Sequence, residues 1–363
     1  MMAESIYRGR RATSIENGLV RVTVLHEGGH IAEILDKRSG VNPLWTPPWP
    51  SIEPSTYDAR KHPEYGADAE SKLLSGIMGH NLCMDIFGAP SPEEAAAGLT
   101  VHGEAPVAVY EIVATHDNAD ADLTARAHFP QSQLRFERRI RLPAGSAVVE
   151  IAETAENESA ADRPIAWTEH VTLGPPFLEK GATQFRASAT RSKVSETAFG
   201  KDMYMKTAAQ FDWPMVPRID SGSADLRVYT DAAASGGFTT HLMDPHRETA
   251  YFLAWSPASR LAFGYVWRRA DFPWLGIWEE NHSRTGAPWN GRTLTRGMEF
   301  GASPMPETRR QMIERGTLFG MPAFRWIPAR TRVETQYRAA VGHADTIPET
   351  LAWAPGGEVR FEP

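Results

Sequence analysis

Three polar side chains stand in sequence contexts where acid–base chemistry is possible. Glu299 lies in the segment Gly-Met-Glu-Phe-Gly, between glycines and large apolar residues. His102 precedes Gly103 just before a strand-like segment, and His170 lies within the apolar stretch 165–173. A carboxylate and an imidazole can both titrate near neutral pH when burial adjusts them. These three are therefore the candidate catalytic residues, although any single histidine more often has a structural hydrogen-bonding role.

A second set of side chains could bind a ligand rather than react with it. The chain has 11 Trp, and the negative face of an indole ring can stack on the C–H groups of a sugar. Core packing is nevertheless the expected role of most of these rings. The candidate substrate-binding residues, which flank glycine-bounded or aromatic segments, are His80, Asn81, Asp244, Asp271, Trp274, Trp278, His282, Trp289 and Arg296.

The sequence argues against several other classes of function. No two histidines are spaced for a metal on a helical segment, and nucleotide-binding or Gly-x-Ser-x-Gly motifs are absent, so we expect no metal and no cofactor. The net charge of −7 comes without clustered Lys and Arg, which argues against nucleic acid. The single cysteine, Cys83, cannot form an internal disulfide. Without a signal-like or membrane-spanning apolar segment, we expect a cytoplasmic protein with no membrane partner. The oligomeric state is left open.

Alternating apolar and polar residues predict that strands must position these side chains. The predicted strands are 20–24, 107–113, 134–142, 149–151, 261–267 and 331–341. Helix is predicted only at 92–97 and at 306–315, before Gly316, and 45–63 is predicted to be a long surface loop. Many antiparallel strands with little helix indicate an all-β fold, a large antiparallel β-sandwich with few short helices. Because no linker divides the chain, we expect one domain over residues 1–363.

The order of these motifs resembles a known family. An opening strand pair at 16–24 and 31–34 is separated by a Gly-Gly turn, and it is followed by His102-Gly103, then Thr168-Glu169-His170, then Glu299 and a closing strand at 331–341. This order is similar to that of the galactose mutarotase-like superfamily, which includes aldose 1-epimerases. The residues after His102 and His170 depart from the usual pattern, so the chain resembles uncharacterised bacterial branches more than galactose mutarotase itself.

The resemblance implies an isomerase of the aldose 1-epimerase type, acting on a monosaccharide or oligosaccharide without a cofactor. In the family the glutamate is the base and the strand histidine is the acid. Carried over, Glu299 would take the proton of the C1 hydroxyl, His170 would protonate the ring oxygen, and His102 would hydrogen-bond the sugar.

Three alternatives stay open at this point. The chain could bind carbohydrate without turnover, or it could be a structural sandwich with no site. It could also be a polysaccharide-active lyase or hydrolase, in which Arg292 or Arg296 near Glu299 neutralises a uronate. Convergence of His102, His170 and Glu299 in space would argue against the structural alternative.

Overall fold

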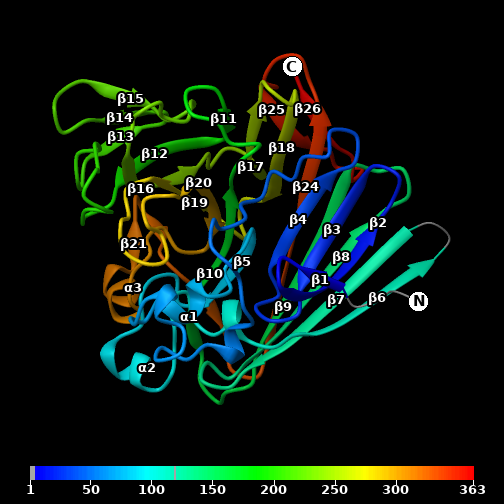
Figure 1. Cartoon of the computed structure of the whole chain (residues 1–363), viewed down its shortest axis with the longest axis vertical. Helices are drawn as coiled ribbons and strands as arrows, with labels where there is room; N and C mark the ends of the chain where they lie inside the picture. The colour runs from blue at the N-terminus through cyan, green and yellow to red at the C-terminus, as the bar shows by residue number, and fades with distance from the viewer. Residues whose placement is uncertain (1–4, 118–119) are drawn as a thin grey trace.

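The computed structural model describes residues 5–117 and 120–363, and most of the regular structure in them is β-strand (Figure 1). The strands form two large sheets, whose neighbouring strands run antiparallel. The fold is thus an all-β antiparallel sandwich with few short helices, as the sequence predicted.

The larger sheet carries two of the three candidate catalytic residues, His170 and Glu299, near its middle. Among the described residues it has twelve strands, with β23 pairing β10 outside the main path. In spatial order they are β1 (Ser5–Tyr7), β2 (Arg10–Glu16), β3 (Val20–Leu25), β4 (Ile31–Asp36), β5 (His80–Asp85), β10 (Arg163–Leu173), β20 (Leu294–Gly301), β19 (Trp274–Asn281), β16 (Ser235–Met243), β12 (Ala189–Val194) and β13 (Gln210–Asp212), with β23 (Arg325–Ile327) at the side.

The second sheet packs against the first and has eight strands in the described part of the chain. Their spatial order is β11 (Gln184–Ala187), β17 (Thr249–Ser256), β18 (Leu261–Arg268), β24 (Arg332–His343), β9 (Val148–Asn157), β8 (Leu134–Leu142), β7 (Asp120–Phe129) and β6 (Glu111–Asp117). Apolar side chains of both sheets form one large buried cluster, in which Trp267 and Phe300 stack with ring centroids 4.3 Å apart.

Short elements complete the structure. Within residues 5–117 and 120–363 there are three two-stranded hairpins: β14 (Met215–Pro217) with β15 (Ser223–Asp225), β21 (Thr317–Leu318) with β22 (Met321–Pro322), and β25 (Thr350–Trp353) with β26 (Val359–Glu362). The helices are α1 (Ser71–Leu74), α2 (Pro92–Ala96) and α3 (Arg309–Arg315), with 3-10 turns at Pro54–Thr56, Pro63–Tyr65 and Ala105–Val107. Figure 1 shows α1, α2 and α3 gathered on one side of the molecule, beside the middle of the larger sheet. Among the described residues, no helix is long and apolar enough to cross a membrane.

The middle strands of the larger sheet are covered on both faces. Strands β5, β16 and β19 are buried at every position, and β10 and β20 at nearly every one. One face packs against the second sheet. The other packs beneath the short helices and the long connections, so any side chain on it lies in a sheltered space rather than in open solvent.

Most predicted elements are confirmed. The strand predictions at 20–24, 134–142, 149–151, 261–267 and 331–341 correspond to β3, β8, β9, β18 and β24, and β8 pairs with β9 as the expected hairpin. Helix α2 confirms the prediction at 92–97, and its first turn is a capping box in which Ser91 and Glu94 each bond the other's backbone.

Two predicted boundaries are wrong. The strand predicted at 107–113 begins only at Glu111, because the preceding backbone bonds the 26–28 turn: Ala108 accepts from Gly28, and Tyr110 donates to His26. The helix predicted from residue 306 begins at Arg309, because the capping box formed by Thr308 and Gln311 fixes its first turn there.

Candidate active site

His170 and Glu299 lie side by side on the covered face of the larger sheet. Strands β10 and β20 are neighbours, and in their register His170 is directly opposite Glu299. Residues directly opposite each other in an antiparallel pair project to the same face. The Nε2 atom of His170 is accordingly 3.1 Å from Oε1 of Glu299, and its Nδ1 is 3.0 Å from the hydroxyl of Thr172.

Glycines around Glu299 make space for its carboxyl group. A Cβ atom at Gly297 would overlap Oε1 of Glu299. Gly276 on β19 is directly opposite Glu299, and a Cβ atom there would lie 2.8 Å from the ring of Phe238. A Cβ at Gly301 would lie 2.5 Å from the hydroxyl of Thr168. The glycines that flank Glu299 in the sequence thus accommodate neighbouring side chains, including the carboxyl group itself.

His102 reaches the same place from a loop. Its backbone is left-handed, with φ of 69°, and Gly103 follows with φ of 84°. Gly103 is required because a Cβ there would overlap the carbonyl of Met84. The ring of His102 lies with its centroid 5.0 Å from that of His170, and its Nδ1 is 2.6 Å from the carbonyl oxygen of Phe87. A carbonyl only accepts, so Nδ1 donates, and Nε2 of the neutral ring is an acceptor.

The three residues line one pocket with a volume of about 260 Å³. Its walls are mainly apolar and come from α1, from the loops around Phe87, Phe199 and Trp289, and from β16 and β19. Trp278 and Trp289 line it, with ring centroids 5.9 Å apart. Behind Trp289 stand Trp45 and Trp49 of the loop predicted at 45–63, at 6.3 and 5.1 Å between ring centroids. The long loop therefore supports the pocket wall.

Burial controls the protonation of the pocket residues. Desolvation raises the pKa of Glu299 to about 8, because an ionised carboxylate is disfavoured there. Desolvation lowers the pKa of His102 to about 4 and brings that of His170 well below its usual value. The His170–Glu299 pair therefore holds one proton at neutral pH, and Oε1 of Glu299 has no well-aligned hydrogen bond within the described residues.

His80 lies elsewhere, between the two sheets. Its Nε2 is 2.8 Å from Glu169 and its Nδ1 is 3.0 Å from the hydroxyl of Tyr265. Arg138 joins the same network, 2.8 Å from Glu169 and 2.5 Å from Glu153. Since His80 faces the core side of β5, the expectation that it contacts substrate is not compatible with its position.

Arg296 is also directed to the core side of the sheet. Its guanidinium donates to Glu279 at 2.9 Å and to the carbonyl of Leu226 at 2.8 Å, and it packs over the rings of Phe185 and Tyr229. It is only 1% exposed. Arg296 holds the sheet together and does not line the pocket.

The remaining predicted residues are distributed around the fold. Asn81 lies on the pocket face of β5, directly opposite His170, and neither polar atom of its buried side chain has a hydrogen-bond partner among the described residues. Trp274 shares that face but bonds the carbonyl of Pro322 and packs on Leu242 and Leu318. The side chains of Asp244, Asp271 and His282 bond the backbone of His246, the hydroxyl of Thr335 and the carbonyl of Gly291, respectively. None of Trp274, Asp244, Asp271, His282 and Arg292 is among the described residues that line the pocket.

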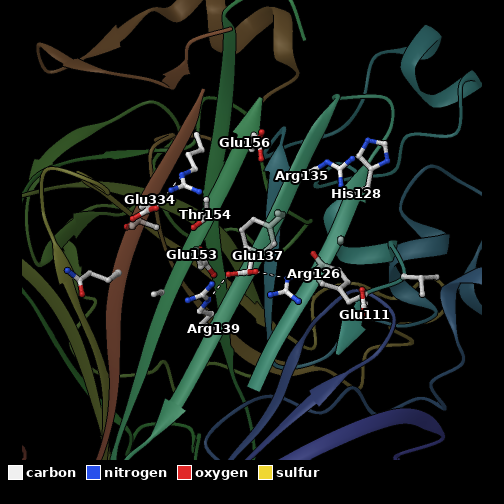
Figure 2. Close-up of a pocket in the computed structure, with 18 of the residues that line it drawn as sticks. Glu111, Arg126, His128, Arg135, Glu137, Arg139, Glu153, Thr154, Glu156 and Glu334 are labelled. Atoms are coloured by element: carbon white, nitrogen blue, oxygen red, sulfur yellow. Dashed lines mark hydrogen bonds and ion pairs between the residues drawn. The ribbon is translucent and has the colours of Figure 1, made fainter. Parts of the chain in front are cut away.

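A larger hollow, of about 1040 Å³, lies against the outer face of the second sheet (Figure 2). Figure 2 shows Glu137 between Arg126 and Arg139, and the Nε atoms of these arginines are 2.6 and 2.5 Å from its carboxylate oxygens. These outward-facing side chains largely pair with one another. The smaller pocket is the better candidate for chemistry, because it alone contains His102, His170 and Glu299.

Sequence reasoning missed several residues at or near the site. Arg284, Glu70 and Phe238 line the pocket, but nothing in their local sequence marks them. The segment His26-Glu27-Gly28-Gly29-His30 matches the zinc motif H-E-x-x-H in letters, but that motif needs a helix. Here it is a turn, in which His26 bonds Thr13 and His30 bonds the carbonyl of Pro106.

Several solved structures have a fold similar to that of this chain. A protein from Klebsiella pneumoniae subsp. pneumoniae, named as a candidate aldose 1-epimerase, is 12% identical with a TM-score of 0.65, over 93% of this chain and 80% of that one. A galactose mutarotase-like protein from Clostridium acetobutylicum is 12% identical with a TM-score of 0.61, over 95% and 99%. Another from Lactobacillus casei is 11% identical with a TM-score of 0.56, over 91% and 100%. At these identities the likeness concerns the fold, and it confirms the galactose mutarotase-like fold that the sequence resemblance predicted.

Sequence comparison gives one further result. No curated protein matches the sequence. A family model with the description "Domain of unknown function (DUF4432)" matches residues 8–287, which is more than half of the 363 residues. The chain belongs to this DUF4432 family.

Proposed function

We propose that the protein is an aldose 1-epimerase-like isomerase, which interconverts the anomers of a sugar by opening and closing its ring. The observation that carries the proposal is the His170–Glu299 pair, 3.1 Å apart in a sheltered pocket that His102 also lines. The mutarotase-like names of proteins with the same fold support the same reaction class.

The proposed reaction requires one acid and one base, and the pair holds one proton. Burial favours that proton on Glu299, with His170 uncharged. In ring opening, Glu299 protonates the ring oxygen while His170 takes the proton of the C1 hydroxyl. The bond between C1 and the ring oxygen breaks and an aldehyde forms.

Ring closure reverses these proton transfers. After rotation about the C1–C2 bond, His170 returns its proton to the C1 oxygen. Glu299, now a carboxylate, removes the proton from the former ring oxygen as that oxygen attacks C1. Glu299 is thus the acid in opening and the base in closure. For ring opening this reverses the roles that the family resemblance implied, in which Glu299 takes the proton of the C1 hydroxyl and His170 protonates the ring oxygen.

His102 has a binding role in this proposal. Its Nδ1 donates to the carbonyl of Phe87, so its Nε2 can only accept. A neutral acceptor suits a sugar hydroxyl that donates to it, and the lowered pKa of about 4 keeps the ring neutral throughout the physiological range. His102 therefore orients the sugar ring rather than stabilising negative charge on it.

The pocket supports a monosaccharide substrate and offers little support for uronate chemistry. Its volume of about 260 Å³ lies below the usual range for drug-sized ligands, about 300–1,000 Å³. A lyase needs a cation to neutralise a uronate. Arg296 is paired with Glu279 on the core side of the sheet, and Arg292 does not line the pocket.

The direct test is anomer exchange followed by NMR over a panel of aldoses, with the spontaneous rate subtracted. We expect catalysed exchange for at least one sugar. Substitution His170→Gln should reduce it by about a hundredfold to ten-thousandfold, the usual contribution of acid–base catalysis. His246→Gln is a matched control, because His246 is exposed in the turn between β16 and β17.

The outcomes separate the proposal from its main rival. Sugar binding without exchange above the spontaneous rate would identify a carbohydrate-binding protein and refute the isomerase. Exchange that survives His170→Gln unchanged would remove the His170–Glu299 pair from the mechanism.

A further inference from the structure

The walls of the pocket have few groups that could bond sugar hydroxyls. Apart from His102, His170, Glu299 and the Arg284–Glu70 ion pair, the lining is largely aromatic or aliphatic and includes Leu73, Leu74, Phe199, Phe238, Trp278 and Trp289. A sugar with hydroxyls on every carbon would press several of them against these walls. Each hydroxyl that loses its water without gaining a hydrogen-bond partner weakens binding.

The pocket also has a cation, but that cation is already neutralised. Nη1 of Arg284 is 3.1 Å from Oε1 of Glu70, and Nε is 3.7 Å from Oε2 of Glu280. The central carbon of the Arg284 guanidinium lies over the aromatic wall, 4.6 Å from the ring centroid of Trp289. Arg284 and Glu70 are 28% and 30% exposed, whereas His170 and Glu299 are 6% and 2% exposed. The ion pair therefore lies toward solvent and the acid–base pair lies at the deep end.

We infer that the substrate is a neutral deoxy sugar, whose hydroxyl-poor part lies against the aromatic and aliphatic walls. The inference rests on the proposed function and narrows it to a substrate class. The hemiacetal end meets His102, His170 and Glu299, where the polar groups are concentrated. The rest of the ring contacts Phe238, Trp278 and the leucines of α1, which favour C–H groups.

An anionic sugar fits the same pocket poorly. Its carboxylate or sulfonate would meet a guanidinium that two carboxylates already accompany. Deeper in the pocket it would have to give up its water beside Glu299, which burial itself keeps protonated. The charge arrangement thus selects a neutral ring.

Three matched sugar pairs test the inference: D-galactose with 6-deoxy-D-galactose, D-mannose with 6-deoxy-D-mannose, and D-glucose with 2-deoxy-D-glucose. D-galacturonate is the anionic probe. For each sugar, the dissociation constant is measured by ligand-observed NMR and kcat/KM by anomer exchange. For at least one pair, we expect the deoxy sugar to bind more tightly and to have a kcat/KM about tenfold to a hundredfold higher than its parent. This is the range within which an apolar pocket discriminates against an added hydroxyl. D-galacturonate should bind more weakly than D-galactose.

The two readouts separate this inference from the proposed function. A deoxy preference in binding, without catalysed exchange, would support the substrate class and refute the isomerase. If exchange is catalysed but the kcat/KM of every parent sugar equals or exceeds that of its deoxy partner, the isomerase is supported and the substrate class is overturned. Failure of all the sugars to bind would overturn the substrate class as well.

A pair of variants tests whether the apolar wall of the pocket causes the preference for deoxy sugars. Val101→Thr keeps the shape of a side chain that lines the pocket and adds one hydroxyl to the wall. This substitution should reduce the ratio of kcat/KM between the deoxy sugar and its parent severalfold. Val113→Thr makes the same change at an exposed site on β6 and should leave the preference unaltered. If both variants behave like the unsubstituted protein, the wall does not set the preference and the inference fails.

Discussion

Replacement of Glu299 by glutamine should slow anomer exchange and should raise the stability of the fold, relative to that of the unsubstituted protein, as the pH increases from 5 to 8. Glutamine keeps nearly the same shape but cannot transfer a proton. Exchange should fall by about a hundredfold to ten-thousandfold, while sugar binding largely survives. The opposite effect on stability follows because burial raises the pKa of Glu299 from 4.5 to about 8.

The size of the stability effect follows from proton linkage. Between pH 4.5 and about 8 the unfolded chain has an ionised Glu299, whereas the folded protein keeps it protonated. The folded state binds the extra proton, so the free energy of unfolding falls as pH rises through this window, by about 1.4 kcal/mol per pH unit. Over the whole interval of 3.5 pH units, from 4.5 to about 8, this amounts to about 5 kcal/mol. The uncharged glutamine lacks this pH-dependent loss.

The assay compares guanidinium unfolding of the two proteins at pH 5, 6, 7 and 8. The buried amide of the variant leaves unpaired polar atoms, which cost about 1–3 kcal/mol at every pH. The informative quantity is therefore the slope: the stability of the variant relative to the unsubstituted protein should rise with pH and then level off above about 8. A difference that does not change with pH would show that Glu299 is not held protonated by burial, and the proposed proton count would be wrong.

Three further predictions follow from the same structure. Catalysed exchange should be nearly constant around neutral pH and fall by about tenfold per unit above pH 8, because ionised Glu299 and neutral His170 leave no acid; a rate that rises with pH would contradict this. Gly297→Ala should cost about a hundredfold in kcat at unchanged fold by circular dichroism, because the added methyl group displaces the Glu299 carboxyl group. Arg138→Met should lower the free energy of unfolding by about 3–5 kcal/mol, since it leaves the buried carboxyl groups of Glu153 and Glu169 without their cation; a neutral effect in denaturant titration would refute this.

Much of the fold could be predicted from the sequence, because strands with one buried face carry a readable alternation. In β8, the alternate residues Leu134, Phe136, Arg138, Ile140 and Leu142 are buried, and the positions between them, 135, 137, 139 and 141, are more exposed. The closing strand β24 shows the same pattern. Boundaries were less predictable, because the end of a segment such as 107–113 depends on hydrogen bonds to a distant turn.

The candidate site was only partly predictable, because it lies on strands that do not show this alternation. Strands β5 and β20 are buried on both faces, so alternation cannot tell which side a polar residue faces. His80 and Asn81 are adjacent in sequence, yet the first faces the core and the second the pocket side of the sheet. Arg296 and Glu299 are divided in the same way. Much of the wall comes from loops and from α1, and no local sequence signal shows that these segments approach the sheet.

The distinction between a structural and a reactive glutamate is finally one of hydrogen bonding. Glu169 and Glu299 both lie near the middle of the larger sheet, are almost fully buried and stand close to a histidine. Glu169 is satisfied: Arg138, His80, Trp167 and Tyr337 all lie within 3.1 Å of its oxygens. In the part of the chain that the structure describes, Oε1 of Glu299 has no well-aligned hydrogen bond, His170 lies 3.1 Å from it, and Glu299 lines the pocket. The hydrogen bonds of Glu169 compensate for its burial. Burial of Glu299 instead raises its pKa and leaves an oxygen available to a ligand, and acid–base catalysis requires both.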